Sequence, residues 1–462
     1  MSVRVRGREV AVVGAGPVGC VLAALLARRG FDVEVFEKRP DMRRTDVDAG
    51  RSINLVLTRR GLRALEVLGL REAVLEMTVP VLGRMMHSTD RELAYTPYGK
   101  DDSECNYSVS RGDLNAFLLD AAADSGARLH FDRELVEADL ESGELVVEDT
   151  ETGERTRRQV DVVFGADGAP SAVRRALMKL PGFFERTDML EHGYKELLFP
   201  AAADGEFPMA GHALHIWPRG DHMLMGLANP NGSFTGTIYL RHEGPDSFAE
   251  IDTPDEVDAF FHAHYADAIG LLEDFQEEFL RHPLGQLGTV RCHPWHLEGK
   301  ALLVGDAAHG IVPFFGQGLN CGFEDCAILD ELLARYDEMR TVFAVFDTRR
   351  KPDAEAIADM ALENFVEMRD LVADPRFVLR KLVETRIEQT FPELYRSRYA
   401  MVMYSTIPYR VAYEVGAVQE ELLGELLEGV REPEDVDMDR AQTLIATKLT
   451  PIHDRYQVDL TF

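Results

Sequence analysis

The strongest chemical signal in the chain is a glycine-rich turn near its start. Gly14, Gly16 and Gly19 are spaced as G-x-G-x-x-G between an apolar segment, 9–13, and an amphipathic segment, 20–29. In a strand–turn–helix unit the first glycine permits the turn, the second lets a pyrophosphate approach, and the third lets the helix pack closely. Free N–H groups at the helix start attract the anion. The spacing predicts a dinucleotide site, and a glycine-rich packing turn is the alternative.

Glu37 indicates which dinucleotide this site would take. It follows a second predicted strand, 31–36, roughly 20 residues after the turn, where a carboxylate can accept hydrogen bonds from ribose hydroxyls. A carboxylate there would repel the 2′-phosphate of NADPH. The turn and Glu37 together therefore predict FAD or NAD in this site.

Two further glycine-containing segments could contact the same cofactor. The first is 165–168, with Asp167 at its centre, and the second begins at Asp306 after an apolar strand. Asp306 could bind a sugar-alcohol chain, and Gly318 would free the backbone N–H groups of Leu319 and Asn320 to face an electron-rich ring. A purely structural turn is the alternative for each segment.

Composition excludes several partner classes. The formal net charge of −30 argues against nucleic acid and anionic membranes, which are themselves negative. The five scattered cysteines are typical of free thiols in a reducing compartment. The apolar run 10–27 contains three glycines and Pro17 and no cleavage site follows it, so we do not interpret it as a signal peptide. No run reaches the ~20 apolar residues of a membrane span, and we expect a cytoplasmic protein without a membrane partner.

The order of predicted elements indicates an α/β fold. A Rossmann-like FAD-binding domain is expected with an inserted mixed β-sheet substrate domain, followed by a helical C-terminal domain. The expected ranges are 1–75, 105–180 and 290–335 for the first domain, 76–104 and 181–289 for the second, and 336–462 for the third.

The three glycine-containing segments, in this order and over most of the chain, resemble the aromatic-ring (class A) flavoprotein monooxygenases. That resemblance implies a bound FAD, O2 as co-substrate, and NADPH that docks only transiently, because a second G-x-G-x-x-G is lacking. Arg111 matches a family arginine near the flavin, with a surface charge as the alternative. The cofactor-binding residues it implies are Gly14, Gly16, Val18, Gly19, Glu37, Lys38, Arg39, Val56, Arg111, Leu135, Asp167, Asp306, Gly318, Leu319 and Asn320.

A narrower resemblance points to the substrate. Segments 50–55, 97–104, 192–196, 213–218, 312–320 and 360–368 are similar to the kynurenine-hydroxylating subfamily, the kynurenine 3-monooxygenases. It implies that Arg84 and Tyr98 hold an amino-acid carboxylate, and that Asn364 and Tyr399 complete the polar cradle. If the segment 84–98 forms a hairpin that turns around 90–92, Arg84 and Tyr98 lie directly opposite each other. The remaining implied substrate contacts are Leu214, Met225, Tyr239, Pro313, Phe314, Phe315 and Met368.

The resemblance implies NADPH-dependent hydroxylation of L-kynurenine to 3-hydroxykynurenine through a flavin C4a-hydroperoxide, as in tryptophan catabolism. No catalytic side chain is then needed, because the flavin carries the chemistry, and His309 is expected to be structural. Leu319 replaces a common Met, and Tyr239 replaces a usual Phe. Tyr239 leaves open a related aromatic amino acid, for instance a methylated kynurenine, and an FAD-dependent reductase that does not use O2 is a further alternative. A homodimer is possible.

Overall fold

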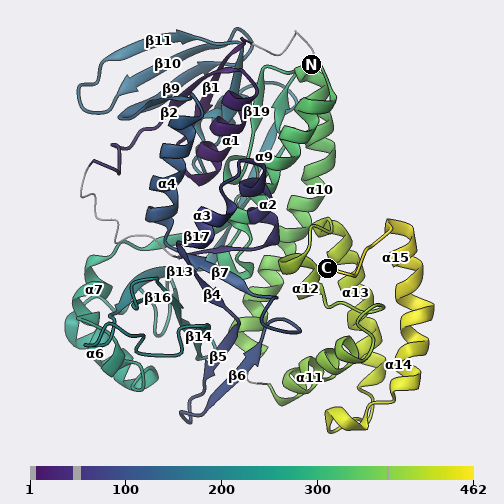
Figure 1. Cartoon of the computed structure of the whole chain (residues 1–462). Coiled ribbons are helices and arrows are strands. Elements are labelled where there is room, and N and C mark those ends of the chain that lie inside the picture. The colour runs from purple at the N-terminus through teal and green to yellow at the C-terminus, as the bar shows by residue number, and fades with distance from the viewer. Residues whose placement is uncertain (1–6, 45–53, 372–373) are drawn as a thin grey trace. The chain divides into compact units, whose positions relative to one another are not determined.

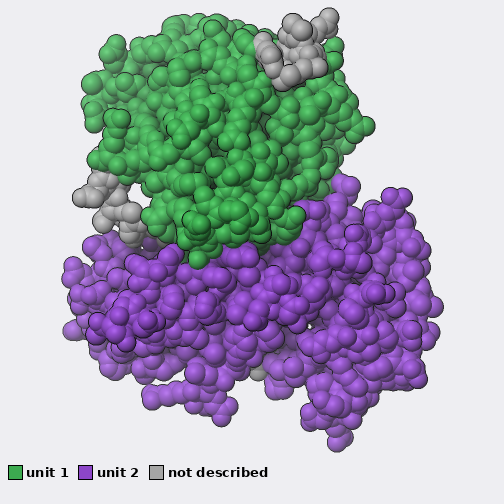
Figure 2. Space-filling view, in the orientation of Figure 1, with its two compact units in different colours: residues 1–78, 109–190, 287–358 green, residues 79–108, 191–286, 359–462 purple. Residues whose placement is uncertain are grey.

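The computed structural model describes residues 7–44, 54–371 and 374–462, which are drawn in colour in Figure 1. The chain divides into two compact units, distinguished by colour in Figure 2. Unit 1 comprises residues 1–78, 109–190 and 287–358, and unit 2 comprises 79–108, 191–286 and 359–462. The chain passes between the units inside regular elements: β4 (Thr78–Val81), β7 (Asn106–Val109), β13 (Phe184–Phe199), β17 (Gly285–His293) and α10 (Met339–Val366).

Unit 1 is built on a six-stranded sheet in the order β18-β19-β12-β1-β2-β8. All neighbours run parallel except the β18–β19 pair. Side chains of the central strand are buried because both faces of a parallel sheet are covered; Val10, Ala11 and Val12 are at most 1% exposed. The strands are β1 (Glu9–Val13), β2 (Asp32–Phe36), β8 (Arg128–His130), β12 (Val162–Gly165), β18 (His296–Leu297) and β19 (Ala301–Leu303).

Helices α1, α4 and α9 pack beside this sheet, with α1 in contact with both of the others (Figure 1). A second, antiparallel sheet has the order β11-β10-β9. The bounds in this unit are α1 (Pro17–Arg28), β3 (Leu55–Leu57), α2 (Arg59–Val67), α3 (Arg71–Leu75), α4 (Arg111–Asp124), β9 (Arg133–Asp139), β10 (Glu144–Asp149), β11 (Arg155–Gln159), α5 (Ala172–Leu177), α8 (Asp306–His309) and α9 (Gly318–Arg335).

The sequence of segment 129–140 predicts a single strand, but the segment contributes to two, β8 and β9. Asp132 adopts a left-handed conformation with φ of 54°, which ends β8 and redirects the chain into β9. The first piece therefore extends the parallel sheet, and the second joins the antiparallel one.

Unit 2 contains most of a seven-stranded sheet in the order β17-β13-β16-β15-β14-β5-β6. The Pro-Arg-Gly turn at 218–220 and the Pro-Asn-Gly turn at 230–232 predict antiparallel strands here. As predicted, β14, β15 and β16 are joined antiparallel, whereas β14 pairs with β5 in parallel. The bounds are β5 (Gly83–His87), β6 (Leu93–Pro97), β14 (Ala213–Pro218), β15 (Met223–Ala228) and β16 (Phe234–Arg241).

The two faces of this sheet have different coverings. Trp217, Leu224 and Ile238 point to one face, where they form a hydrophobic core with helices α6 (Pro254–His264) and α7 (Phe275–Arg281). Since side chains alternate along a strand, residues one position away from these, such as Met225 and Tyr239, point to the opposite face.

From α9 onward the described chain is mostly helical, which agrees with the helical character predicted for 336–462. The helical elements of unit 2 after α10 are the π-helical turn η3 (Glu367–Leu371), α11 (Pro375–Thr390), α12 (Arg398–Tyr404), α13 (Tyr409–Leu426), α14 (Met438–Leu444), the π-helical turn η5 (Ile445–Leu449) and α15 (Thr450–Tyr456). The division into three domains stays a prediction, because compactness alone does not decide which segments fold independently.

The predicted hairpin is present, but its register is wrong by two residues. Arg84 pairs with Thr96, and not with Tyr98, because Ser88 and Glu92 close the turn and centre it one residue earlier. A shift of two residues keeps Tyr98 on the same face as Arg84, since side chains alternate with period two.

Candidate functional site

The glycine-rich turn in unit 1 has the geometry of a dinucleotide cradle. Gly14 has a φ of 99°, and a Cβ there would lie 2.5 Å from the carbonyl oxygen of Ala166. A Cβ on Gly19 would lie 2.0 Å from the carbonyl oxygen of Gly14, so α1 packs too closely on the turn for any side chain. A Cβ on Gly16 would meet nothing within 4 Å. The backbone therefore faces open space where a pyrophosphate would approach the first N–H groups of α1, and these residues fit FAD.

Glu37 lies against this turn. Its Oε2 accepts a hydrogen bond from the N–H of Ala15 at 2.8 Å, and its Oε1 accepts from the N–H and Nε of Arg39 at 3.0 and 2.8 Å. Burial alone would raise the pKa of Glu37, but the Arg39 guanidinium and the backbone N–H groups outweigh it and hold the pKa below its usual value. Glu37 is thus an ionised group at the place where the sequence predicts the ribose.

Asp167 stabilises the start of helix α5 in unit 1. Its carboxylate accepts hydrogen bonds from the Ser171 hydroxyl at 2.5 Å and the N–H of Ala172 at 2.6 Å, which caps the start of α5. Arg174 then links this segment to the third one, because its Nη1 donates to the carbonyl oxygen of Ala307 at 2.8 Å.

Asn320 ties the predicted flavin loop to β3. Its Oδ1 accepts from the N–H of Thr58 at 2.9 Å, and its Nδ2 donates to the carbonyl oxygens of Val56 at 2.7 Å and Gly316 at 2.9 Å. These bonds use both N–H donors of the side chain, whereas the backbone N–H groups in the first turn of α9 have no partner within the helix and can face a ligand. A Cβ on Gly318 would have one neighbour at 3.9 Å, which leaves that approach open.

A buried carboxylate holds the turn that presents Asp306. Asp325 is fully buried, and its Oδ2 accepts hydrogen bonds from the N–H of Gly305 at 3.0 Å and from Nε2 of His309 at 2.6 Å. Gly305 has a φ of 62°, which favours glycine. The exposed Asp306 follows it directly as the first residue of α8.

Asp325 belongs to a larger buried charge network. Nε of Arg350 lies 2.7 Å from Oδ1 of Asp325, and its Nη1 lies 2.7 Å from Glu324, which also pairs with Arg60 at 2.7 Å. Burial alone would lower the pKa of His309, but the Cys321 sulfur and the Asp325 carboxylate raise it well above its usual value. His309 is therefore held within this network by the buried Asp325 and Cys321 side chains.

His309, Cys321 and Asp325 also lie close enough together to suggest a metal site. Nη2 of Arg350 is 3.2 Å from Sγ of Cys321, and its Nε binds Asp325. A permanent positive charge at this position takes the place that a cation would need, so we interpret the cluster as part of the charge network.

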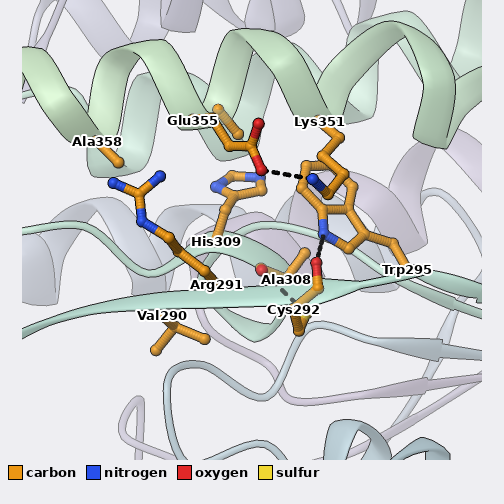
Figure 3. Close-up of a pocket in the computed structure, with 10 residues that line it drawn as sticks. Val290, Arg291, Cys292, Trp295, Ala308, His309, Lys351, Glu355 and Ala358 are labelled. Carbon is orange, nitrogen blue, oxygen red and sulfur yellow. Dashed lines mark hydrogen bonds and ion pairs between the residues drawn. The ribbon is translucent and has the colours of Figure 1, made fainter. Parts of the chain in front are cut away.

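A small cavity borders His309 between β17 and α10 (Figure 3). Its volume is about 10 Å³, which is room for one water molecule. Trp295 closes one side through a hydrogen bond from its Nε1 to the carbonyl oxygen of Cys292 at 3.0 Å, and the Lys351–Glu355 ion pair closes another. This cavity is too small for an aromatic substrate or a nicotinamide.

The other predicted cofactor residues also belong to unit 1. Lys38, Arg39 and Arg111 are exposed, Val18, Val56 and Leu319 are half-buried, and Leu135 is buried in β9. Their contacts with FAD stay predictions. Most of segment 50–55 lies outside the described residues.

In unit 2 the register of the large sheet brings the predicted substrate residues to one face. Arg84 pairs with Leu214. Ile216, two residues further along the same strand, pairs with Met225. Met225 also pairs with Thr237, which lies two residues before Tyr239. Paired residues and residues two apart point the same way. Arg84, Leu214, Met225 and Tyr239 therefore share the face opposite to that covered by α6 and α7.

Arg84 is surrounded by aromatic hydroxyls on this face. Its Cζ lies 5.3 Å from the centre of the Tyr98 ring, which stacks on Tyr399 at 5.3 Å. Burial alone would lower the pKa of Arg84, but the oxygens of Tyr98 and Tyr399 and the carboxylate of Glu367 raise it. Within the described part of the chain, no carboxylate lies within 4 Å of the Arg84 guanidinium to form an ion pair.

Asn106 is a member of this cluster that sequence reasoning missed. It is 3% exposed, its Nδ2 donates to Tyr399 Oη at 3.0 Å, and its Oδ1 has no hydrogen-bond partner among the described residues. A buried polar atom without a partner is costly unless a ligand satisfies it. No short sequence pattern marks Asn106, because its partner lies 293 residues further along the chain.

The remaining predicted substrate residues are divided between the two units, with Asn364, Met368 and Tyr239 in unit 2 and Pro313, Phe314 and Phe315 in unit 1. Asn364 contacts Met368, with Nδ2 at 3.3 Å from Sδ, as their spacing of four residues predicts. Tyr239 is 3% exposed, and burial raises the pKa of its hydroxyl. Pro313, Phe314 and Phe315 form a 3-10 turn in unit 1, and their role as walls of the substrate pocket stays a prediction.

Among the described residues, the structure contains no helix with both the length and the apolar character required to cross a bilayer.

Comparison with known proteins agrees with this geometry. Residues 8–361 match the family described as FAD binding domain. A relative from Myxococcus xanthus (strain DK1622) named kynurenine 3-monooxygenase is 52% identical over 96% of each chain. One of the same name from Xanthomonas oryzae pv. oryzae (strain PXO99A) is 41% identical over 96% of this chain and 98% of its own.

Solved structures support the same fold at lower identity. The tetrameric form of 2-methyl-3-hydroxypyridine-5-carboxylic acid oxygenase is 20% identical with a TM-score of 0.64, over 81% of this chain and 95% of its own. Tetracycline destructase Tet(55) is 18% identical with a TM-score of 0.58, over 78% and 89%. The chain belongs to the FAD-binding-domain family of monooxygenases and, within it, to the family of kynurenine 3-monooxygenases.

Proposed function

We propose that this protein hydroxylates L-kynurenine to 3-hydroxykynurenine, with FAD as bound cofactor and with NADPH and O2 as co-substrates. The observation that carries the proposal is the 52% identity, over 96% of each chain, to a relative named for this reaction. The polar cluster around Arg84 supports it, because a guanidinium without an ion-pair partner among the described residues matches the carboxylate of an amino-acid substrate.

FAD, when bound, supplies electron transfer from NADPH and the activation of O2. Gly14, Gly16 and Gly19 bind its pyrophosphate, and Glu37 accepts hydrogen bonds from the adenosine ribose. The ionised Glu37 repels the 2′-phosphate of NADPH, so NADPH binds elsewhere and only transiently.

In unit 2 the side chains bind and orient the substrate. Arg84 forms two parallel hydrogen bonds with the kynurenine carboxylate, and Tyr98 adds a neutral donor. Leu214 and Met225 exclude water from the aromatic ring, which fixes the ring carbon next to the amine for oxygen transfer. That carbon is already electron-rich because the amine donates into the ring, so no protein base has to activate it.

One experiment tests the proposal. Purified, FAD-loaded protein is supplied with NADPH in the presence and absence of L-kynurenine, oxygen uptake is recorded, and the product is identified by mass spectrometry. We expect oxygen uptake that depends on kynurenine and one added oxygen atom in the product. NADPH oxidation without oxygen uptake would show a reductase instead, and preferred turnover of a ring-methylated kynurenine would show a related hydroxylase.

We place the enzyme in the cytoplasm. The acidic composition and the free, buried cysteines support this location. Homodimer formation is a further part of the proposal, and light scattering of the holoenzyme tests it.

A further inference from the structure

Away from the sites described above, unit 2 brings three metal-binding side chains together. His222 lies directly before β15, Asp246 lies in the loop between β16 and α6, and His264 is the last residue of α6. One ligand atom from each side chain lies within 4.8 Å of the others. Nε2 of His264 is 3.5 Å from Oδ2 of Asp246.

These distances are close to those of a tetrahedral zinc site. Bonds of about 2.0–2.2 Å from zinc to nitrogen or oxygen place neighbouring ligand atoms about 3.3–3.5 Å apart. The His264–Asp246 pair already has this separation. Asp246 is exposed and lies at a turn with φ of 51°, so its side chain is accessible to an ion from solvent.

The ring of His222 is buried and held in place by neighbouring side chains. It is 6% exposed, and its ring centre lies 4.7 Å from that of His264. Its Nδ1 lies 2.6 Å from the hydroxyl of Tyr265. A hydrogen bond from one ring nitrogen to a neighbouring group is what orients metal-binding histidines in proteins.

We propose that His222, Asp246 and His264 form a binding site for a transition-metal dication, with Zn²⁺ as the probe and at least one coordination position left to water. Two imidazoles and one carboxylate are a donor set that zinc and its neighbours in the first transition row prefer. The net charge of −30 raises the local concentration of cations.

The position of this site determines what a bound ion does. The ion joins the β14–β15 turn, the loop before α6 and the end of α6, which covers the sheet face opposite Arg84. It therefore cross-links the hydrophobic core of unit 2 and does not enter the face that carries the predicted substrate residues. The expected effect is stabilisation of the folded protein, since a ligand that binds only the folded state favours it.

The test uses tag-free, FAD-loaded protein that has been treated with a chelator and dialysed. Zn²⁺ binding is measured by isothermal titration calorimetry in the parent and in His264→Gln, Asp246→Asn and His262→Gln. His262 is the matched control, because it lies on the same helix and pairs with Asp258 at 3.5 Å, but no third ligand joins this pair among the residues that the structure describes.

We expect one equivalent of Zn²⁺ to bind the parent and His262→Gln in the micromolar range, and its affinity to fall more than about tenfold in His264→Gln and Asp246→Asn. Zn²⁺ should raise the thermal midpoint of the parent and of His262→Gln only. Absorbance of bound FAD and near-ultraviolet circular dichroism verify that each variant is folded. The proposal is overturned if the parent shows no saturable binding below millimolar Zn²⁺, or if His264→Gln and Asp246→Asn bind Zn²⁺ like the parent.

Discussion

The guanidinium of Arg84 lies over the Tyr98 ring, with Cζ 5.3 Å from the ring centre, although the strand ladder pairs Arg84 with Thr96. The two residues are diagonal neighbours on one face of the hairpin, a separation that long and aromatic side chains bridge. The contact keeps the guanidinium on this face, where it has no carboxylate partner among the described residues.

Replacement of Arg84 should therefore weaken kynurenine binding much more than FAD binding. A hydrogen bond to a charged partner contributes about 1.5–3 kcal/mol, so Arg84→Ala should lose roughly 10- to 100-fold in affinity. Arg84→Lys should recover only part of this, because an ammonium group cannot form two parallel bonds, and Tyr98→Phe should lose less. Titration of each variant with kynurenine, followed by the flavin absorbance change, measures the effect.

The matched control for this series is Arg91→Asn. Arg91 is an exposed residue in the turn of the same hairpin, with φ of 64°, a conformation that Asn tolerates. The Arg91→Asn variant should bind kynurenine like the parent. If Arg84→Ala also binds kynurenine like the parent, the carboxylate site lies elsewhere.

Glu37→Gln should release FAD more easily. The change keeps the shape of the side chain but removes the charge that pairs with Arg39 and that we propose to bind the ribose hydroxyls. We expect FAD affinity to fall about tenfold or more, since bonds to charged groups contribute about 1.5–3 kcal/mol. Recovery of flavin fluorescence on dilution measures the dissociation constant. Glu34→Gln is the control on the same strand, because Glu34 contacts Arg128 and His130 at 3.5 and 3.3 Å. Equal FAD loss in both variants would contradict the role of Glu37.

Asp325→Asn should lower both stability and FAD affinity. Breaking a buried ion pair costs about 3–5 kcal/mol, and here the change also weakens the support of the Gly305–Asp306 turn. Urea unfolding and FAD titration measure the two effects. Asp330→Asn, on the same helix, removes a partly exposed carboxylate that pairs with Arg29, and it should change neither quantity by a comparable amount.

The same network predicts opposite pH dependences for two residues. Burial alone would raise the pKa of Asp325, but His309 and Arg350 outweigh it and lower the pKa. Its stabilisation is therefore complete above its usual pKa of about 3.9 and is lost as the pH falls further. The difference in unfolding free energy between the parent and Asp325→Asn should stay constant above about pH 5 and narrow in acid.

For His309 the folded-state pKa is raised, so its stabilisation is complete below its usual pKa of about 6.5 and is lost as the pH rises through the folded value. The difference in unfolding free energy between the parent and His309→Gln should be largest at or below pH ~6.5 and should narrow in alkali. Urea unfolding across the pH range measures the free energy of unfolding of the parent and of both variants. A difference between the parent and His309→Gln that grows as the pH rises would contradict this prediction.

Local patterns in the sequence predict local structure well in this protein. The turn at 14–19, the strands on either side of it and the antiparallel β14–β16 meander depend on short-range spacing and turn residues, and they appear as predicted. The sixteen-residue strand β13 was missed because its first half is exposed and polar and lacks alternation.

What the sequence does not reveal is decided by conformation or by distant partners. The hairpin register depends on the left-handed Arg91 in its turn, and the split of β8 from β9 depends on the left-handed Asp132; neither residue is a glycine. The role of Asn106 depends on Tyr399, and that of Asp325 depends on Gly305 and Arg350, none of which is adjacent in sequence.

The two-faced sheet of unit 2 has a consequence for how the protein tolerates change. Along β14, Leu214 and Ile216 point to the face that carries the predicted substrate residues, whereas His215 and Trp217 point to the opposite face. Alternate residues of the same strand thus serve two purposes, the predicted recognition of substrate and the packing of the hydrophobic core. A substitution damages one of them, whereas deletion of a single residue from β14 exchanges the two faces and destroys both at once.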